Sequence, residues 1–156
     1  MAKVEGGYQM TLSWVPLHEK HLPSNAVCAG DNVYVGRGMM GSEMVPGKYV
    51  QGHSTLYVPY GGQEVSVHHP EILCVTGQGY GQFYTWEFAR DGNVPNSSVC
   101  AAIAGDGNPV FVARGRVQGE VCVGKMHAGH NSAYFPWGGQ EIPMREYEVL
   151  VWRKKN

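Results

Sequence analysis

The chain carries two copies of one sequence unit, and this constrains its fold more than any other feature. Placing Arg37 on Arg114 aligns the two halves without a gap at a period of about 77 residues. An upstream stretch around Trp14 matches one around Trp86 at a period about five residues shorter, so one loop differs in length. The positions of the first copy that recur are Trp14, Pro23, Val27-Cys28, Arg37-Gly38, Glu43, Gly47-Lys48, Gly52-His53, Tyr57, Pro59, Gly61-Gly62-Gln63-Glu64, Glu71 and Leu73.

The length of 156 residues favours one body with a shared core. Two independent halves of about 75 residues would each bury too little surface. We therefore expect pseudo-twofold symmetry, with residues 8–76 as the first repeat, 77–81 as a glycine-rich connector and 82–153 as the second repeat. Two copies of a unit bring two copies of any site, which suits a multivalent binder better than an enzyme with one pocket.

The pattern of apolar residues predicts strands and no long helix. Glycine or proline interrupts every stretch before apolar residues can keep helical spacing for three turns, and the chain has 22 Gly and 9 Pro. We expect an all-β fold in which two pseudosymmetric tandem repeats pack into one compact β-sandwich-like body. The valine-rich and aromatic runs that predict strands are residues 32–35, 56–58, 72–75, 83–88, 110–113, 133–135 and 147–152.

Charge and composition exclude several classes of partner. The formal net charge is -1, and the one basic run is the terminal Arg153-Lys154-Lys155, so neither nucleic acid nor an anionic membrane is expected as a partner. No segment is apolar for long enough to insert into a bilayer. The first seven residues do not resemble a signal peptide, which predicts a cytoplasmic protein, with release by a non-classical route as the alternative.

The reactive side chains do not form a pattern typical of catalysis or of a metal site. The four cysteines lack Cys-x-x-Cys spacing and are expected to be buried thiols. Two histidine pairs are three residues apart, whereas the zinc-protease motif needs four on a helix. There is no nucleophile elbow and no evident Cys/His dyad. We expect no enzyme activity, no cofactor and no metal.

The order of the recurring residues resembles the DM-nine repeat family. In the first copy the ordered set is Trp14, Pro23-Ser24, Ala29-Gly30-Asp31, Tyr34-Val35-Gly36-Arg37, Glu43, Pro46-Gly47-Lys48, residues 59–64 and Glu71-Ile72-Leu73. The second copy gives Trp86, Pro95-Asn96, Ala104-Gly105-Asp106, Phe111-Val112-Ala113-Arg114, Glu120, Gly124-Lys125, residues 136–141 and Tyr147-Glu148-Val149-Leu150. Within this family, the chain resembles in particular the small tandem-repeat proteins that act as mannose-specific lectins in invertebrate innate immunity.

The resemblance implies a function and a set of binding residues. It implies an often dimeric all-β body that binds mannose without calcium through an Asp and a Lys in each repeat. These fall on Asp31 with Lys48 and on Asp106 with Lys125. Two departures stand out: the loop between Asp31 and Arg37 is shorter than usual, and Val123 replaces the expected proline before Gly124-Lys125, which should affect only the stiffness of a turn.

The predicted site has a simple chemical rationale. Sugar hydroxyls both donate and accept hydrogen bonds, so a carboxylate facing an ammonium can bind two of them. Glu43 and Glu120 lie five residues before the lysines and are predicted either to hold the ammonium or to accept a sugar hydroxyl. The structural alternative is that the aspartates are turn residues and the lysines are solvated. Whether each Asp/Lys pair lies within one repeat or across the repeats is open.

Three further pairs of equivalent residues have alternative roles. Tyr60 and Trp137 could stack on a sugar or pack in the core. The arginine that ends a strand in each copy is expected to form a structural salt bridge or a backbone contact. His53 and His130 follow a glycine in each copy and are candidates to border the sugar pocket.

Two functions remain in competition at this point. The first is a calcium-independent lectin with one site per repeat, which recognises mannose-containing glycans of microbial surfaces, as an expected homodimer. The second is a non-catalytic protein-protein interaction or targeting module that uses exposed sheet edges. The natural glycan cannot be read from the sequence.

Overall fold

The structure is a computed structural model that describes residues 3–4, 8–9, 11–18, 21–76 and 83–153. Its described residues form strands and turns without any helix, so none contains a helix that could cross a membrane. The predicted connector 77–81 lies outside the described residues. The all-β expectation is confirmed.

Each strand of the first repeat from β3 onward has a counterpart in the second. The strands of the first repeat are β3 (Leu12–Pro16), β4 (Cys28–Gly30), β5 (Val33–Met40), β6 (Glu43–Val50), β7 (Thr55–Tyr60), β8 (Gln63–Val67) and β9 (Glu71–Val75). Their counterparts are β10 (Tyr84–Arg90), β11 (Cys100–Ile103), β12 (Pro109–Val117), β13 (Glu120–His127), β14 (Ala133–Trp137), β15 (Gln140–Met144) and β16 (Glu146–Trp152). Two short strands, β1 (Lys3–Val4) and β2 (Tyr8–Gln9), form a separate ribbon.

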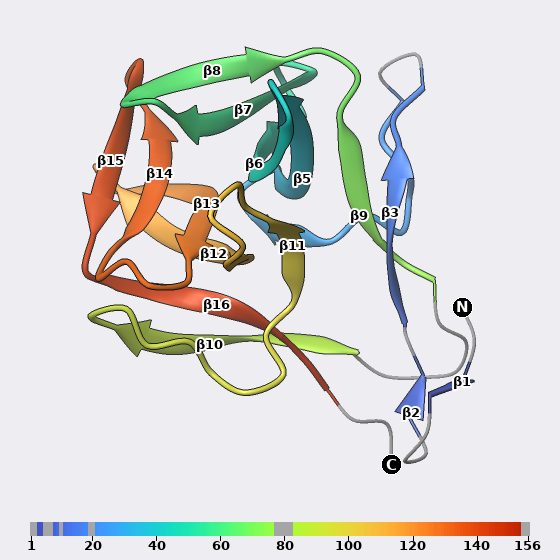
Figure 1. Cartoon of the computed structure of the whole chain (residues 1–156). Coiled ribbons are helices and arrows are strands. Elements are labelled where there is room, and N and C mark those ends of the chain that lie inside the picture. Colours follow the sequence, from blue (N-terminus) through green and yellow to red (C-terminus); the bar gives the residue numbers. More distant parts are fainter. Residues whose placement is uncertain (1–2, 5–7, 10, 19–20, 77–82, 154–156) are drawn as a thin grey trace.

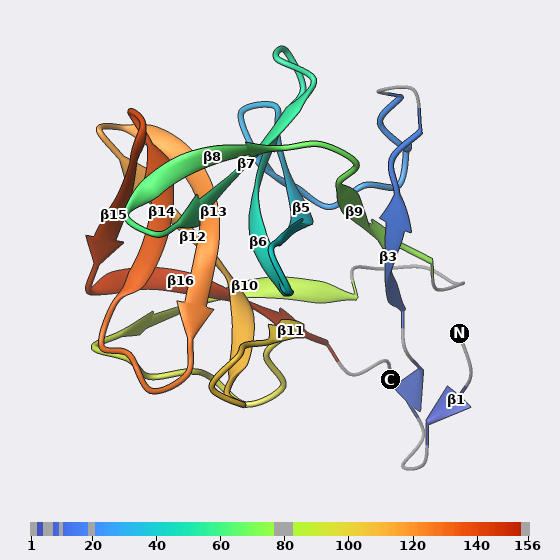
Figure 2. The ribbon, with the colours of Figure 1, turned by 45° about the horizontal axis from the view of Figure 1, so that its top comes forward.

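The strand order of the large sheet is symmetric about its centre. The path runs β10-β16-β12-β13-β14-β15-β8-β7-β6-β5-β9-β3, so every strand lies opposite its repeat counterpart (Figure 1). At the centre Gln63 of β8 pairs with its own equivalent, Gln140 of β15. The hairpins β7–β8 and β14–β15 therefore meet at the pseudo-twofold axis (Figure 2). The duplication in the sequence appears directly as a palindrome in the sheet.

Reciprocal hydrogen bonds join the repeats at this axis. The Glu64 carboxylate accepts from the Gly139 amide at 2.9 Å, and the Glu141 carboxylate accepts from the Gly62 amide at 2.8 Å. The amides of the same two glutamates donate to the carbonyls of the same two glycines, at 3.1 and 3.0 Å. The glycine-rich turns have positive φ angles at all four glycines, which permits this close backbone approach.

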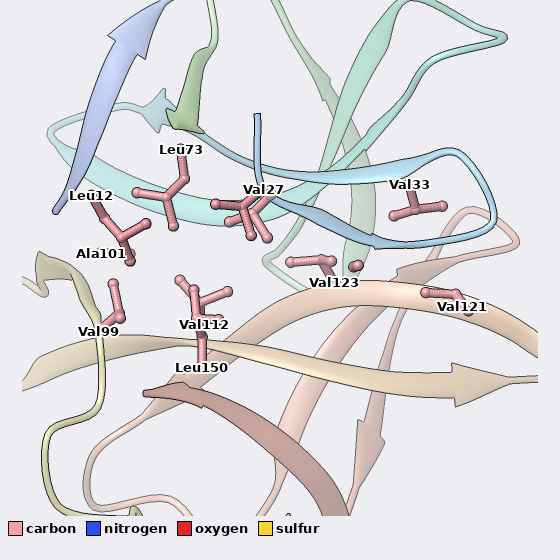
Figure 3. Close-up of a cluster of buried hydrophobic side chains, with 12 residues drawn as sticks. Leu12, Val27, Val33, Leu73, Val99, Ala101, Val112, Val121, Val123 and Leu150 are labelled. Carbon is pink, nitrogen blue, oxygen red and sulfur yellow. The ribbon is translucent and has the colours of Figure 1, made fainter. Parts of the chain in front are cut away.

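The core is partly shared, as the size of the chain predicted. One buried cluster draws Leu12, Val27 and Leu73 from the first repeat and Val112 and Leu150 from the second, and Figure 3 shows the two sets facing each other. Two further clusters each lie within one repeat. Because this shared cluster is apolar, neither repeat can leave the other without exposing part of its own core.

An arginine in each repeat ties this frame across the interface. Arg37 forms an ion pair with Glu71 at 2.7 Å, donates to the Ala101 carbonyl of the other repeat at 2.6 Å and lies 4.5 Å from the centroid of the Trp14 ring. Arg114 makes the equivalent contacts. The predicted structural role of these arginines is confirmed.

The prediction of a turn at Val123-Gly124 is wrong. Gly47 and Gly124 lie inside strands β6 and β13 rather than in turns, so the replacement of proline by Val123 does not concern a turn. A Cβ atom at Gly47 would lie 2.1 Å from the Tyr57 carbonyl oxygen, which explains the need for glycine within the strand.

The four cysteines are not uniformly buried. Cys74 and Cys122 are buried free thiols whose pKa is raised by burial, but Cys28 and Cys100 are exposed. The reason is strand alternation: Val27 and Ala29 on either side of Cys28 point into the core, so Cys28 points outward.

Candidate functional site

The lysine of each repeat is held by a glutamate on the neighbouring hairpin. Lys48 is only 8% exposed and lies on β6 opposite Tyr57 of β7. Its Nζ is 3.3 Å from Oε2 of Glu64 and 3.6 Å from Sγ of Cys122, a residue of the second repeat. The Nζ of Lys125 is 2.9 Å from Oε2 of Glu141. Neither lysine is a solvated surface residue, so this half of the structural alternative is wrong, whereas both aspartates do lie in turns.

Glu43 and Glu120 do not hold these ammonium groups, so the first of their two predicted roles is wrong. Five is an odd number of residues, so along a strand each glutamate points to the opposite face from its lysine. Glu43 instead accepts a hydrogen bond from the Gly105 amide at 2.6 Å. Glu120 accepts one from Nε1 of Trp137 at 2.8 Å. Both contacts are compatible with a place at the rim of a site.

Sequence reasoning missed Glu64 and Glu141 as partners of the lysines. Both belong to the recurring Gly-Gly-Gln-Glu motif, which was interpreted only as a turn. The available signal was that a buried lysine needs a carboxylate and that a hairpin after the lysine strand would bring this one back to it.

A cleft of about 610 Å³ brings residues of both repeats together at the first lysine. The first repeat contributes Asp31 and Lys48, so this aspartate and this lysine line the same cleft. The second repeat contributes the other wall with Glu120. The full lining is Asp31, Val33, Lys48, Val50, His53, Tyr57, Glu64, Gly119, Glu120, Val121, Trp137 and Gly138.

The composition of this cleft is mixed, with charged groups beside aromatic rings. Trp137 is half-buried, packs against the core of the second repeat and also lines the cleft, so it combines the two predicted roles. Tyr60 packs against the first core and lies with its ring centroid 5.5 Å from Nζ of Lys125, on the opposite side of the axis. Each lysine region therefore has an aromatic residue from the other repeat.

The two aspartates have different surroundings. Asp31 occupies a tight turn with Asn32, both with positive φ, and its side chain is 71% exposed, with Nη1 of Arg116 at 3.9 Å. Asp106 lies in a longer loop, and its carboxylate accepts hydrogen bonds from the Asn108 amide at 2.9 Å and from Nε2 of His127 at 3.0 Å. The Asn108 amide and then the His127 imidazole hold the pKa of the Asp106 carboxyl below its usual value.

The two predicted pocket histidines also differ. His53 lines the cleft, with its Nδ1 3.1 Å from the Tyr57 hydroxyl. His130 stacks on His127 with ring centroids 4.4 Å apart. Within the described part of the chain, no group of three or more His, Cys, Asp or Glu side chains could hold a metal ion.

Arg116 is another residue that sequence reasoning did not single out. It belongs to the second repeat but reaches Asp31 of the first. Its equivalent in the first repeat is Met39, so the repeat pattern gave no signal for it.

The fold and the cleft define a pseudosymmetric all-β protein built from two tandem units around a shared core. The DM9 repeat family matches residues 28–144, and the chain belongs to this family. A comparison with curated protein sequences gives no match.

A solved structure shares the fold. It is that of the nematode sperm cell motility protein MFP2B, with a TM-score of 0.65 and 15% sequence identity. The similarity covers 93% of this chain and 45% of MFP2B, so the chain spans less than half of that protein.

Proposed function

We propose that the protein is a calcium-independent lectin that binds mannose on glycans, with one site per repeat. The observation that carries the proposal is the cleft in which Asp31, Lys48 and Glu120 converge beside Tyr57 and Trp137. Carboxylates accept from sugar hydroxyls, and an ammonium donates to them. Aromatic faces suit the apolar side of a pyranose ring.

The ammonium of Lys48 is positioned to donate into the cleft. An ammonium group has three N–H donors, and Glu64 and Cys122 account for two of them. The third is available to a hydroxyl of a ligand. Burial fixes the side chain before the ligand arrives, so little rotamer entropy is lost on binding.

Calcium independence follows from the same lysine. A calcium site needs six to eight oxygen ligands. Here a fixed cation already lies beside Glu64 in the cleft, and a second cation would be repelled by it. In this proposal the Lys48 ammonium, rather than a bound metal ion, is the cation that the hydroxyl oxygens of the sugar approach.

Weak individual sites are consistent with a duplicated protein. Two or three charge-assisted hydrogen bonds of roughly 1.5–3 kcal/mol each support millimolar to micromolar affinity per site, once the costs of association are subtracted. Two sites per chain, as we propose, doubled again in a homodimer, would raise the avidity for a repetitive microbial surface. We propose binding without catalysis.

Calorimetry tests the proposal. Mannose, galactose and glucose are titrated into the protein in the presence of EDTA, and the number of sites per chain is fitted. We expect heat from mannose, with two sites per chain. The Asp31→Asn variant should weaken one site about tenfold, whereas Asp91→Asn, which removes an exposed carboxylate paired with Arg145 away from the cleft, should weaken neither.

A protein-protein interaction module is the second candidate. Met39, Phe88 and Ile103 are large apolar side chains that are more than half exposed, and such residues favour protein contacts. If none of the three sugars produces binding heat with the folded protein, the lectin function is wrong and the interaction module remains as the candidate.

A further inference from the structure

A second cavity lies beside the proposed mannose cleft. Its volume is about 580 Å³, and it lies between the open end of the β7–β8 hairpin, the turn from β6 to β7 and Leu17. Tyr57 lines both cavities. The two cavities are therefore adjacent.

The register of the hairpin shows how the cavities follow one another. Glu64 lines the first cavity and Ser66 the second, and residues two apart on a strand point to the same face, about 7 Å from each other. Ser66 lies directly opposite Tyr57 on β7. A chain of sugars seated on Glu64 and Tyr57 would thus reach Ser66 with its next unit.

The chemistry of the second cavity differs from that of the first. Its described lining has no Asp, Glu, Lys or Arg. It offers hydroxyl groups from Ser54, Thr55 and Ser66 and the imidazole of His68, beside apolar groups such as Leu17. Hydroxyls and imidazoles donate and accept without demanding a charged partner, which suits a neutral polyol.

We propose that this cavity is a second sugar subsite, so that the first repeat binds a neutral oligosaccharide of two or more units. The inference rests on the proposed lectin function and specifies its ligand class. The site with Lys48 and Asp31 holds one sugar, and the site with Ser66, His68 and Thr55 holds the next.

The second repeat does not reproduce this subsite. Pro143 stands where the first repeat has Ser66 and faces Tyr134, so the hydroxyl is missing. Arg145 stands at the position of His68 and is ion-paired with Asp91 at 3.0 Å. Only one of the two sites per chain is therefore extended.

The test compares mannose with an unbranched mannotriose by calorimetry on the full chain. We expect one of the two sites to bind mannotriose about fivefold to tenfold more tightly than mannose, as one or two added neutral hydrogen bonds allow. A Ser66→Val/His68→Ala double variant should lose this gain and keep its affinity for mannose. The matched control, Pro143→Ala/Arg145→Ala in the second repeat, should keep the gain.

Chemical shifts give a readout that does not depend on a variant. Mannotriose, but not mannose, should shift the NMR signals of Thr55 and Ser66 in the unmodified protein. If mannose binds but mannotriose gains nothing, or if the gain persists in the double variant, the subsite is wrong and the lectin function stands. If neither sugar binds, both are wrong.

Discussion

The two repeats agree in their frame and differ at the aspartate of their sites. The arginine to glutamate distances are 2.7 and 2.8 Å, and the arginines lie 4.5 and 4.6 Å from their tryptophan rings. By contrast, the side chain of Asp31 projects into solvent, whereas Asp106 accepts hydrogen bonds from Asn108 and His127. The position of His127 is occupied by Val50 in the first repeat.

This difference teaches that a duplicated fold need not give duplicated sites. The contacts at the pseudo-twofold axis are reciprocal, as in Glu64 with Gly139 and Glu141 with Gly62. A contact at the rim of a site can diverge: Arg116 pairs with Asp31, but the first repeat has Met39 at the position of Arg116. We therefore expect two mannose sites with a common lysine and glutamate but unequal affinity.

The largest expected effect is a loss of stability when the strand glycines that both repeats share, Gly47 and Gly124, are replaced. A Cβ at Gly47 or at Gly124 would lie about 2 Å from a backbone oxygen of the next strand. Each alanine variant should lose about 3 kcal/mol of unfolding free energy, because a backbone group cannot move away as a flexible side chain can. Urea denaturation measures this.

A second glycine pair serves as the control. Gly52 has open space around its Cβ position and no positive φ, whereas its equivalent Gly129 has a φ of 98°. Gly52→Ala should therefore be neutral and Gly129→Ala mildly destabilising, by roughly 1 kcal/mol. Wild-type stability in Gly47→Ala or Gly124→Ala would contradict the account of the frame.

The next effect concerns the aspartates themselves. Asp31→Asn should weaken mannose binding at the first site roughly tenfold, since one charge-assisted hydrogen bond becomes a neutral one. Asp106→Asn should weaken the second site by less than about threefold, because its carboxylate already serves Asn108 and His127. Calorimetry with a two-site fit measures both. Equal losses would remove the proposed difference between the repeats.

The sequence predicted the fold class, the shared core and the role of the two arginines. These features depend on period, strand alternation and residue type, all of which are local or repeated. The pairing of Lys48 with Glu64 was missed because it depends on strand register across three strands. The Val123-Gly124 pair was misread as part of a turn, since the close approach that requires glycine is visible only once β14 is in place.

The contacts that cross from one repeat to the other were the least accessible to sequence. Arg116 reaches Asp31, and Glu43 reaches Gly105, at separations of more than 60 residues. Repeat alignment compares equivalent positions and carries no information about which positions of different repeats touch. The assignment of Glu43 to its own Lys48 failed for this reason.

His127 and Val50 occupy equivalent positions, and exchanging the two residue types tests whether they cause the difference between the sites. His127→Val should release the Asp106 carboxylate and raise mannose affinity at the second site about threefold, the equivalent of one partly broken neutral hydrogen bond. Val50→His places an imidazole in the cleft near Asp31 and should lower affinity at the first site by a similar factor. Calorimetry of each variant, in a background with the other aspartate replaced by asparagine, separates the two sites.

Conservative substitutions control for changes in packing. His127→Asn keeps a hydrogen-bond donor and should leave affinity closer to that of the unmodified protein than His127→Val does. Val50→Ile keeps the side chain apolar and should leave the first site unchanged. An increase in second-site affinity in His127→Asn as large as in His127→Val would show that the hydrogen bond to Asp106 is not the cause.

The smallest effect is the dependence of stability on pH through Asp106. Its folded-state pKa is lowered, so its stabilising contribution is fully present above the ordinary pKa of about 3.9 and is lost as the pH falls through the lower folded value. The difference in stability between the unmodified protein and Asp106→Asn should thus be constant above about pH 5 and shrink in more acidic solution. Denaturation at a series of pH values measures it.

The titration of the carboxyl group itself separates the two causes of this shift. The hydrogen bond from the Asn108 amide is the first cause of the lowered pKa, so a ¹³C titration of Asp106 in His127→Val should still show a pKa below the ordinary value. A return to the ordinary value would mean that the imidazole alone holds the carboxylate. In that case the difference between the repeats would reduce to the single exchange of His127 for Val50, and the longer loop around Asp106 would have no part in it.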